Sequence, residues 1–210
     1  VKQIEPDLVI LQVSSNDFWD NVRQLDIAIL VIRKYMRLYY IAQRMEYHTP
    51  HSFQLMQGPL GNLRVARVVY YQLQRLRIDK KYAILNGHIE SQGIQHEGLQ
   101  ASLQVTSELM QKIKQLVNDI PLVVFLADDR MPYNAQWKNI CDRQGILFID
   151  GIASAVDAHE AWGLSCKISD RIHWNEQGQQ IAGELLARHL AAFLSRHGSD
   201  KKVFPDTLKQ

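Results

Sequence analysis

An aspartate and a histidine three residues apart, Asp170 and His173, are the side chains of this sequence best suited to chemistry. They lie in the pattern Asp170-x-x-His173-x-Asn175-x-x-Gly178. A hydrolase that uses serine needs an imidazole to take the hydroxyl proton and a carboxylate to orient that imidazole. One turn of chain fixes two residues at this spacing locally, so the pattern suits a general base with its orienting acid. Taken alone, the same spacing also arises by chance in solvated turns before helices.

A second polar group, Ser14-Ser15-Asn16-Asp17, directly follows an apolar run. Ligands of open α/β sheets bind outside the carboxyl ends of the strands. The amide of Asn16 can donate a hydrogen bond to an oxyanion, and losing one such donor costs about 3–4 kcal/mol of transition-state stabilisation. The alternative is that Asn16 only turns or caps the chain after a strand. We expect Asp17 to brace the loop.

Apolar patterning predicts the elements that position these residues. Three short apolar runs predict buried strands of a parallel sheet, at residues 7–13, 121–126 and 146–150. Apolar residues at three- and four-residue spacing predict helices at 22–45, 63–76, 102–117, 134–143 and from about 175 to 198. Residues 86–98 and the segment from 151 to 169 are expected to be loops. This alternation predicts the α/β class with right-handed crossovers.

The helix predicted at 102–117 has four apolar residues that we expect to contact the core, namely Leu103, Leu109, Ile113 and Leu116. The helix predicted at 134–143 is closed by Gln144-Gly145.

Composition favours one ordinary domain, residues 1–198, followed by a polar tail at 199–210. The 210 residues are 46% hydrophobic and 22% charged, and the net charge of +2 does not recommend a nucleic-acid partner. Cys141 and Cys166 are too few for a disulfide framework or a zinc cluster. The longest apolar block, Ile27–Ile32, is far shorter than the roughly 20 residues of a spanning helix, so stable membrane insertion is not expected.

The sequence begins Val1-Lys2-Gln3-Ile4-Glu5-Pro6, without an initiator methionine or a signal-peptide core, and an apolar run follows at once. We interpret the chain as a fragment or a processed product. The compartment stays open, with the cell envelope or secretion favoured over the cytoplasm.

The run Pro6–Leu11 leading to Asn16-Asp17, together with the Asp170-x-x-His173 pattern, resembles two sequence blocks of the SGNH (GDSL-type) serine esterases. This resemblance implies a three-layer α/β/α, flavodoxin-like fold. It implies His173 as the general base, Asp170 as its orienting acid and Asn16 as an oxyanion donor. It implies no cofactor and no metal.

The sequence departs from that family in several places. No Gly-Asp-Ser, the family's nucleophile motif, occurs in the 210 residues, and the block that supplies a second oxyanion donor is also absent. Ser14 stands where the family has glycine, and neither Ser14 nor Ser15 is expected to replace the nucleophile. Trp174 stands where proline often follows the histidine, and we expect it to pack on the last helix rather than to wall an acyl pocket.

The predicted strands correspond to the third, fourth and fifth of the flavodoxin-like order 2-1-3-4-5. Without the first two strands, residues 7–13 form an uncovered apolar edge. We therefore expect the chain to be truncated, unless another chain completes the sheet.

The resulting function hypothesis is ester hydrolysis of a small acyl or acetyl ester, on a small molecule or a glycan, with the chain by itself inactive. Acyl transfer to a glycan by the same residues, and a non-catalytic SGNH-like binding or assembly module, are the alternatives. The oligomeric state stays open.

Three other groups of residues receive lower weight. His88, Glu90, His96 and Glu97 match no metal motif. The basic stretch with Arg64, Arg67, Arg75, Arg77, Lys80 and Lys81 is interpreted as the solvated face of a helix rather than a phosphate or acidic-glycan site. Residues 27–40 are expected to pack in the core rather than to form a lid.

Overall fold

The computed structural model describes residues 6–22, 37–41, 44–48, 63–169 and 172–197. The chain divides into two compact units. Unit 1 comprises Val1–Ser14, Lys114–Arg130 and Trp137–Gln210, and unit 2 comprises Ser15–Ile113 and Met131–Gln136. Each unit is described by itself. The single domain at 1–198 stays a prediction, and the tail at 199–210 lies outside the described residues.

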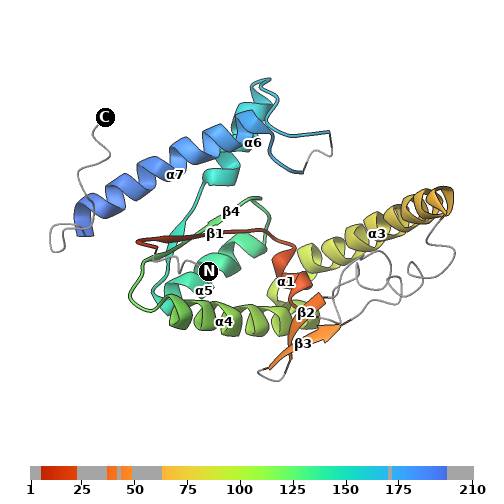
Figure 1. Cartoon of the computed structure of the whole chain (residues 1–210), viewed down its shortest axis with the longest axis horizontal. Helices are drawn as coiled ribbons and strands as arrows, with labels where there is room; N and C mark the ends of the chain where they lie inside the picture. Colours follow the sequence, from red (N-terminus) through yellow and green to blue (C-terminus); the bar gives the residue numbers. More distant parts are fainter. Residues whose placement is uncertain (1–5, 23–36, 42–43, 49–62, 170–171, 198–210) are drawn as a thin grey trace. The chain divides into compact units, whose positions relative to one another are not determined.

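Unit 1 contains a parallel sheet of three strands, β1 (Val9–Val13), β4 (Leu122–Leu126) and β5 (Leu147–Ile149), in the order β1-β4-β5 (Figure 1). Val9 pairs with Leu122, and Val123 pairs with Leu147. The three predicted strands and the α/β class are therefore confirmed.

The outer strand β1 and the central strand β4 differ in burial. All five residues of β4 are buried, as expected for a central strand covered on both faces. The prediction that β1 is buried on both faces is wrong, because Ile10 is 43% exposed and Gln12 is also exposed. Alternate side chains of a strand point to opposite faces, so one face of this edge strand is open.

Helices α6 (Ile152–Ala161) and α7 (Glu176–His197) cover one face of the sheet. Their residues Ile152, Val156 and Ile181 form a core cluster with Val123 and Phe125 of β4. Figure 1 shows α5 (Tyr133–Gln144) on the opposite side, and the part of α5 from Trp137 onward belongs to unit 1.

Helix α5 ends as its sequence predicts. Gly145 has a φ of +61°, which favours glycine. Its N–H donates to the Asp142 carbonyl at 3.2 Å, and the N–H of Ile146 donates to the Cys141 carbonyl at 2.9 Å. These two bonds are the Schellman pattern that closes a helix.

Helix α6 contradicts the expectation of a loop between β5 and Asp170. Only three of its ten residues are buried, namely Ile152, Ala153 and Val156. So few buried positions do not show a clear helical period in the sequence. Packing against α7 and the sheet stabilises the helix, although its own sequence pattern does not predict it.

Unit 2 begins with α1 (Asp17–Asp20) and contains an antiparallel pair, β2 (Arg37–Ile41) and β3 (Arg44–His48). The helix predicted for 22–45 is wrong across this pair, and residues 23–36 lie outside the described residues. The run Leu38-Tyr39-Tyr40-Ile41 is rich in aromatic and β-branched residues, which suit a pleated strand. Tyr39, paired with Glu46, is buried at 1% exposure.

The long helix α3 (Arg64–Gln92) extends past the predicted end at 76. A short 3₁₀ turn, η3 (Gly93–Gln95), and helix α4 (Glu97–Val117) follow. The loop predicted at 86–98 is therefore wrong, because only the turn at Gly93, with a φ of +57°, interrupts the helices.

The buried face of α4 also differs from the prediction. Leu99, Ser102, Thr106 and Met110 are buried, whereas the expected core residues Leu103, Leu109 and Ile113 are half-buried and Leu116 is 84% exposed. Ser102 donates its hydroxyl hydrogen to the Phe18 carbonyl, and the Asn21 amide donates to Thr106 at 3.2 Å. Polar side chains can occupy a core when their hydrogen bonds are satisfied.

Aromatic packing completes the core of unit 2. Tyr133 stacks on Phe18, with ring centroids 5.8 Å apart, and meets the edge of Trp19 at 5.6 Å. The indole N–H of Trp19 donates to the Tyr133 hydroxyl at 3.1 Å. These contacts fix α1 and therefore the turn that carries Asn16.

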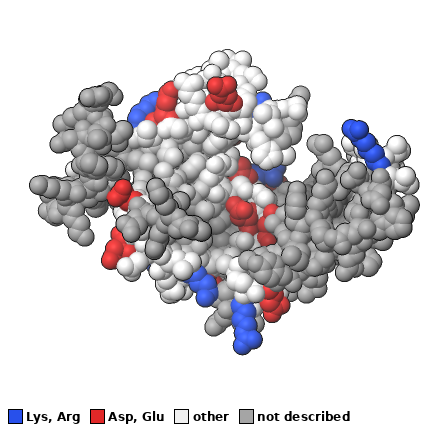
Figure 2. All heavy atoms as spheres, in the orientation of Figure 1, with Lys and Arg blue, Asp and Glu red and all other residues white. Residues whose placement is uncertain are grey.

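Among the described residues, no helix is both long and apolar enough to span a membrane. On the face shown in Figure 2, the described acidic and basic side chains are scattered rather than gathered by sign.

A matched pair of substitutions tests the assignment of the core. Val123→Ala removes two methyl groups from a side chain with 0% exposure and should lower the free energy of unfolding by about 1–3 kcal/mol. Val65→Ala, at a position with 75% exposure, should change it by less than about 0.5 kcal/mol. Urea denaturation measures both, and equal effects would contradict the buried position of β4.

Candidate functional site

His173 lies in the loop that joins α6 to α7 in unit 1. Its backbone carbonyl accepts a hydrogen bond from the Ile168 N–H at 2.9 Å. The N–H of Asn175 donates to the Cys166 carbonyl at 3.0 Å, and Lys167 and Trp174 form an antiparallel bridge between these two bonds. The two arms of this segment, hereafter the 166–175 loop, therefore pair with each other. The His173 side chain is exposed.

Asn175 connects the 166–175 loop to the first turn of α7. Its side-chain Oδ1 accepts the N–H of Gly178 at 3.0 Å, which satisfies one of the amides that a helix leaves without a partner at its start. Its Nδ2 donates to the Ser165 carbonyl at 2.8 Å. One side chain therefore caps the helix and holds the loop backbone.

Gly178 allows the loop to approach the helix closely. A Cβ atom at this position would lie 2.3 Å from the Cys166 carbonyl oxygen and 3.1 Å from the Trp174 Cβ. Because Cβ atoms do not approach backbone oxygens so closely, any larger residue must push the loop away. The spacing of Asn175 and Gly178 in the sequence pattern thus has a structural cause. Trp174 packs against the core cluster, which includes Ile181 and Ala182 of α7.

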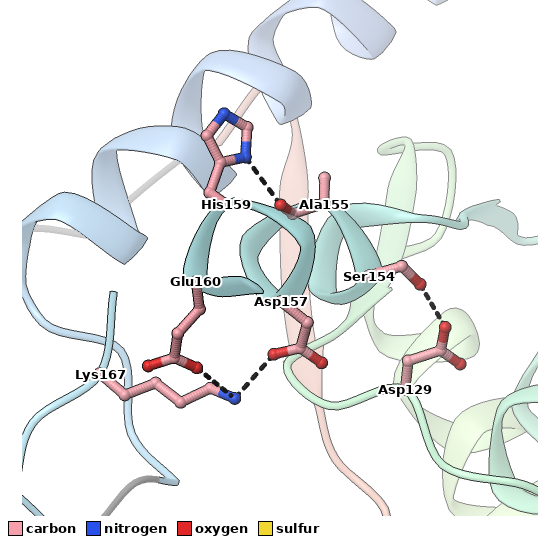
Figure 3. Close-up of polar contacts among 7 residues, drawn as sticks. All are labelled: Asp129, Ser154, Ala155, Asp157, His159, Glu160 and Lys167. Carbon is pink, nitrogen blue, oxygen red and sulfur yellow. Dashed lines mark hydrogen bonds and ion pairs between the residues drawn. The ribbon is translucent and has the colours of Figure 1, made fainter. Parts of the chain in front are cut away.

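Lys167 fixes the loop to α6 (Figure 3). Its ammonium group lies 2.7 Å from Asp157 Oδ1 and 3.1 Å from Glu160 Oε2, and its side chain is only 20% exposed. The hydrogen bond to Asp157, followed by that to Glu160, raises the pKa of Lys167 against the lowering effect of burial. The 166–175 loop is thus held by α6 through side chains and by α7 through backbone contacts.

The carboxyl ends of the strands in unit 1 carry further polar groups. Asp128 and Asp129 follow β4, and Asp150 follows β5. The hydroxyl group of Ser154, in α6, donates a hydrogen bond to Asp129 (Figure 3). Ser154 was not predicted from the sequence, because α6 was expected to be a loop.

Asn16 belongs to unit 2, where it begins α1. Its carbonyl accepts the N–H groups of Trp19 at 3.0 Å and Asp20 at 2.9 Å. Its Nδ2 donates to Asp20 Oδ2 at 3.3 Å, and the side chain is exposed. The turn-forming alternative for Asn16 is therefore present in the structure, and the oxyanion role stays a prediction.

The predicted site residues are distributed over both units. His173 is in unit 1 and Asn16 in unit 2, so each is described within its own unit. Asp170 lies outside the described residues. The residues on either side of it, Cys166–Ile168 and His173–Asn175, are described and pair with each other.

The four residues considered for a metal lie on helices or their ends. His88 and Glu90 are exposed on α3, and Glu97 begins α4. His96 Nδ1 accepts the N–H of Leu99 at 3.2 Å, which caps α4. The described residues contain no group of three or more His, Cys, Asp or Glu side chains able to hold a metal ion.

No family model matches the chain, and comparison with curated proteins and with solved structures gives no match either. The resemblance to SGNH esterases therefore rests on the two sequence blocks.

Two glycines of α7 provide a matched test of the loop contact. Gly178→Ala should lower the free energy of unfolding by about 2–3 kcal/mol, because its Cβ meets the Cys166 carbonyl. Gly183→Ala, where nothing lies within 4 Å of the added Cβ, should raise it by about 0.5–1 kcal/mol through helix propensity. Thermal denaturation monitored by circular dichroism compares them. A neutral Gly178→Ala would show that the loop does not approach the helix as described.

Proposed function

We propose that this chain carries the acid–base half of an SGNH-type ester hydrolase that acts on a small acyl or acetyl ester. His173 takes the proton of a serine hydroxyl and later returns it to the leaving alcohol. Asp170 orients the imidazole and stabilises its protonated form. Asn16 donates a hydrogen bond to the oxyanion of the tetrahedral intermediate.

The observation that carries this proposal is the way the backbone of His173 is held. Hydrogen bonds on both sides of the 166–175 loop, and the cap formed by Asn175, fix the main chain, while the imidazole is exposed. A proton shuttle needs a well-positioned backbone together with an accessible ring. A merely solvated turn needs no second element to hold it, whereas here Lys167 of the loop pairs with Asp157 and Glu160 of α6.

The parallel sheet gives secondary support. Its three strands lie in the order expected for strands three to five of a flavodoxin-like sheet, and the turn with Asn16 follows the carboxyl end of β1. The three-layer SGNH arrangement, with two further strands beside β1, is part of the proposal. The nucleophilic serine is supplied by residues other than these 210, which contain no Gly-Asp-Ser.

Two alternatives use the same fold. An acyltransferase would pass the acyl group from the serine to a glycan hydroxyl instead of water, with His173 in the same role. A binding or assembly module would keep the acid and base without a nucleophile. An acylated glycan among the products identifies the first, and the absence of serine reactivity identifies the second.

Fluorophosphonate labelling of the protein expressed from its entire natural coding sequence tests the proposal. We expect a covalent adduct and hydrolysis of a short aryl ester. His173→Ala should lower kcat by about 10³-fold or more, because the serine loses its base. His189→Ala, an exposed histidine on α7, should leave kcat unchanged.

A folded full-length protein that neither labels nor hydrolyses the ester would overturn the esterase proposal. The 210-residue chain by itself should show negligible hydrolysis. Turnover by this chain that disappears in His173→Ala would show that the serine has been wrongly placed outside it.

A further inference from the structure

Helix α3 presents an apolar surface to solvent. Val65, Val68, Val69, Leu73 and Leu76 are 75%, 53%, 51%, 56% and 69% exposed. At 100° per residue these positions fall within an arc of about 140°, so they share one side of the helix. These five residues are hereafter the apolar face of α3. Exposed large apolar residues gathered on one helix face indicate an interaction surface rather than scattered surface residues.

The charge of the same part of the chain has one sign. No Asp or Glu occurs between Glu46 and Asp79, whereas the first half of α3 carries Arg64, Arg67, Arg75 and Arg77. Lys80 and Lys81 follow. The described side chains of Arg64, Lys80 and Lys81 are exposed.

Four of the six basic positions lie beside the apolar face in the helical register, Arg64 and Arg75 next to one border and Arg77 and Lys81 next to the other. Gln72 is the one polar position of the arc between Val65 and Leu76, and Asp79 and Lys80 follow on the same side of the helix after Leu76. An apolar face bordered by basic residues on both sides is the pattern of a helix that lies in the surface of an anionic bilayer.

Other partners fit these two features less well. A second copy of α3 would bring two basic helices together, and the like charges would oppose the contact. A nucleic acid would pair with the arginines but would leave the apolar face in water. Only a surface that offers both hydrocarbon and negative charge is complementary to both features.

We propose that α3 binds the surface of an anionic lipid bilayer. The helix lies in the plane of the surface, with Val65, Val69 and Leu76 at the boundary between headgroups and acyl chains and with the basic residues near the lipid phosphates. This inference does not depend on the proposed esterase function, because it concerns residues of α3 and requires no turnover.

Vesicle flotation of the full-length protein tests the inference. We expect binding to vesicles of phosphatidylcholine with about one third phosphatidylglycerol, and binding at least about tenfold weaker to pure phosphatidylcholine, since each basic residue near an anionic surface contributes. Added salt should weaken the binding to the anionic vesicles.

Substitutions separate the apolar from the charged contribution. Val65→Ser, Val69→Ser and Leu76→Ser combined should weaken binding at least about tenfold. These side chains are exposed, so the fold should survive, and circular dichroism verifies it. Leu116→Ser, at an 84% exposed position on α4, is the matched control and should bind like the wild type.

Absence of binding to anionic vesicles overturns the inference, and so does equal binding to both kinds of vesicle. Binding that is unchanged in the triple variant but is competed away by free inorganic phosphate would overturn it in favour of a phosphate site. A dimer, measured by analytical ultracentrifugation, that dissociates in the triple variant would overturn it in favour of a second copy of the chain.

Discussion

The backbone carbonyls of Ser165 and Cys166 lie against the first turn of α7, where Asn175 donates to both of them. The Nδ2 of Asn175 lies 2.8 Å from the Ser165 oxygen, and its backbone nitrogen lies 3.0 Å from the Cys166 oxygen. The Cys166 oxygen occupies space that a side chain at position 178 would need. The start of a helix requires acceptors for its free N–H groups, and Asn175 supplies one to Gly178 with its Oδ1. The position of His173 depends on this small set of contacts.

The rest of unit 1 supports the same contact from both sides. Cys166 is fully buried in the cluster that joins β4, β5, α6 and α7, so the loop is tied to the sheet. Burial raises the pKa of the other cysteine, Cys141, to about 12, which makes that thiol unreactive near neutral pH. Lys167 binds two carboxylates of α6 with a largely buried side chain. Cys166 and Lys167 thus anchor the loop to the sheet and to α6, while His173 itself is exposed.

The sequence predicted the elements whose patterns reflect their surroundings. The continuous apolar run of β4 follows from burial on both faces, and Gly145 follows from the left-handed turn that ends α5. The segment 37–48 was misread because apolar residues at three- and four-residue spacing also fit an antiparallel pair. Helix α6 was missed because packing against α7, rather than its own periodicity, stabilises it.

The site was predictable only in its residue types. The spacing of Asp170 and His173 pointed to acid–base chemistry, and Asn175 and Gly178 were visible as parts of the same pattern. The contacts of Asn175 and Gly178 could not be predicted, because they involve the main-chain carbonyls of Ser165 and Cys166, a segment with no recognisable sequence pattern. The hydrogen bond from Ser154 to Asp129 was not predicted for a related reason, since it exists only once α6 forms.

Amide hydrogen exchange measured by NMR tests most directly whether Asn175 holds the turn of His173. The N–H groups of Ile168 and Asn175, which donate to the His173 and Cys166 carbonyls, should be protected in the wild type. In Asn175→Ala they should exchange at least about tenfold faster, while the amides of β4 stay unchanged. Two results would contradict this account. One is that both amides of the wild type exchange as fast as those of an unstructured peptide. The other is that they exchange equally fast in the wild type and in Asn175→Ala.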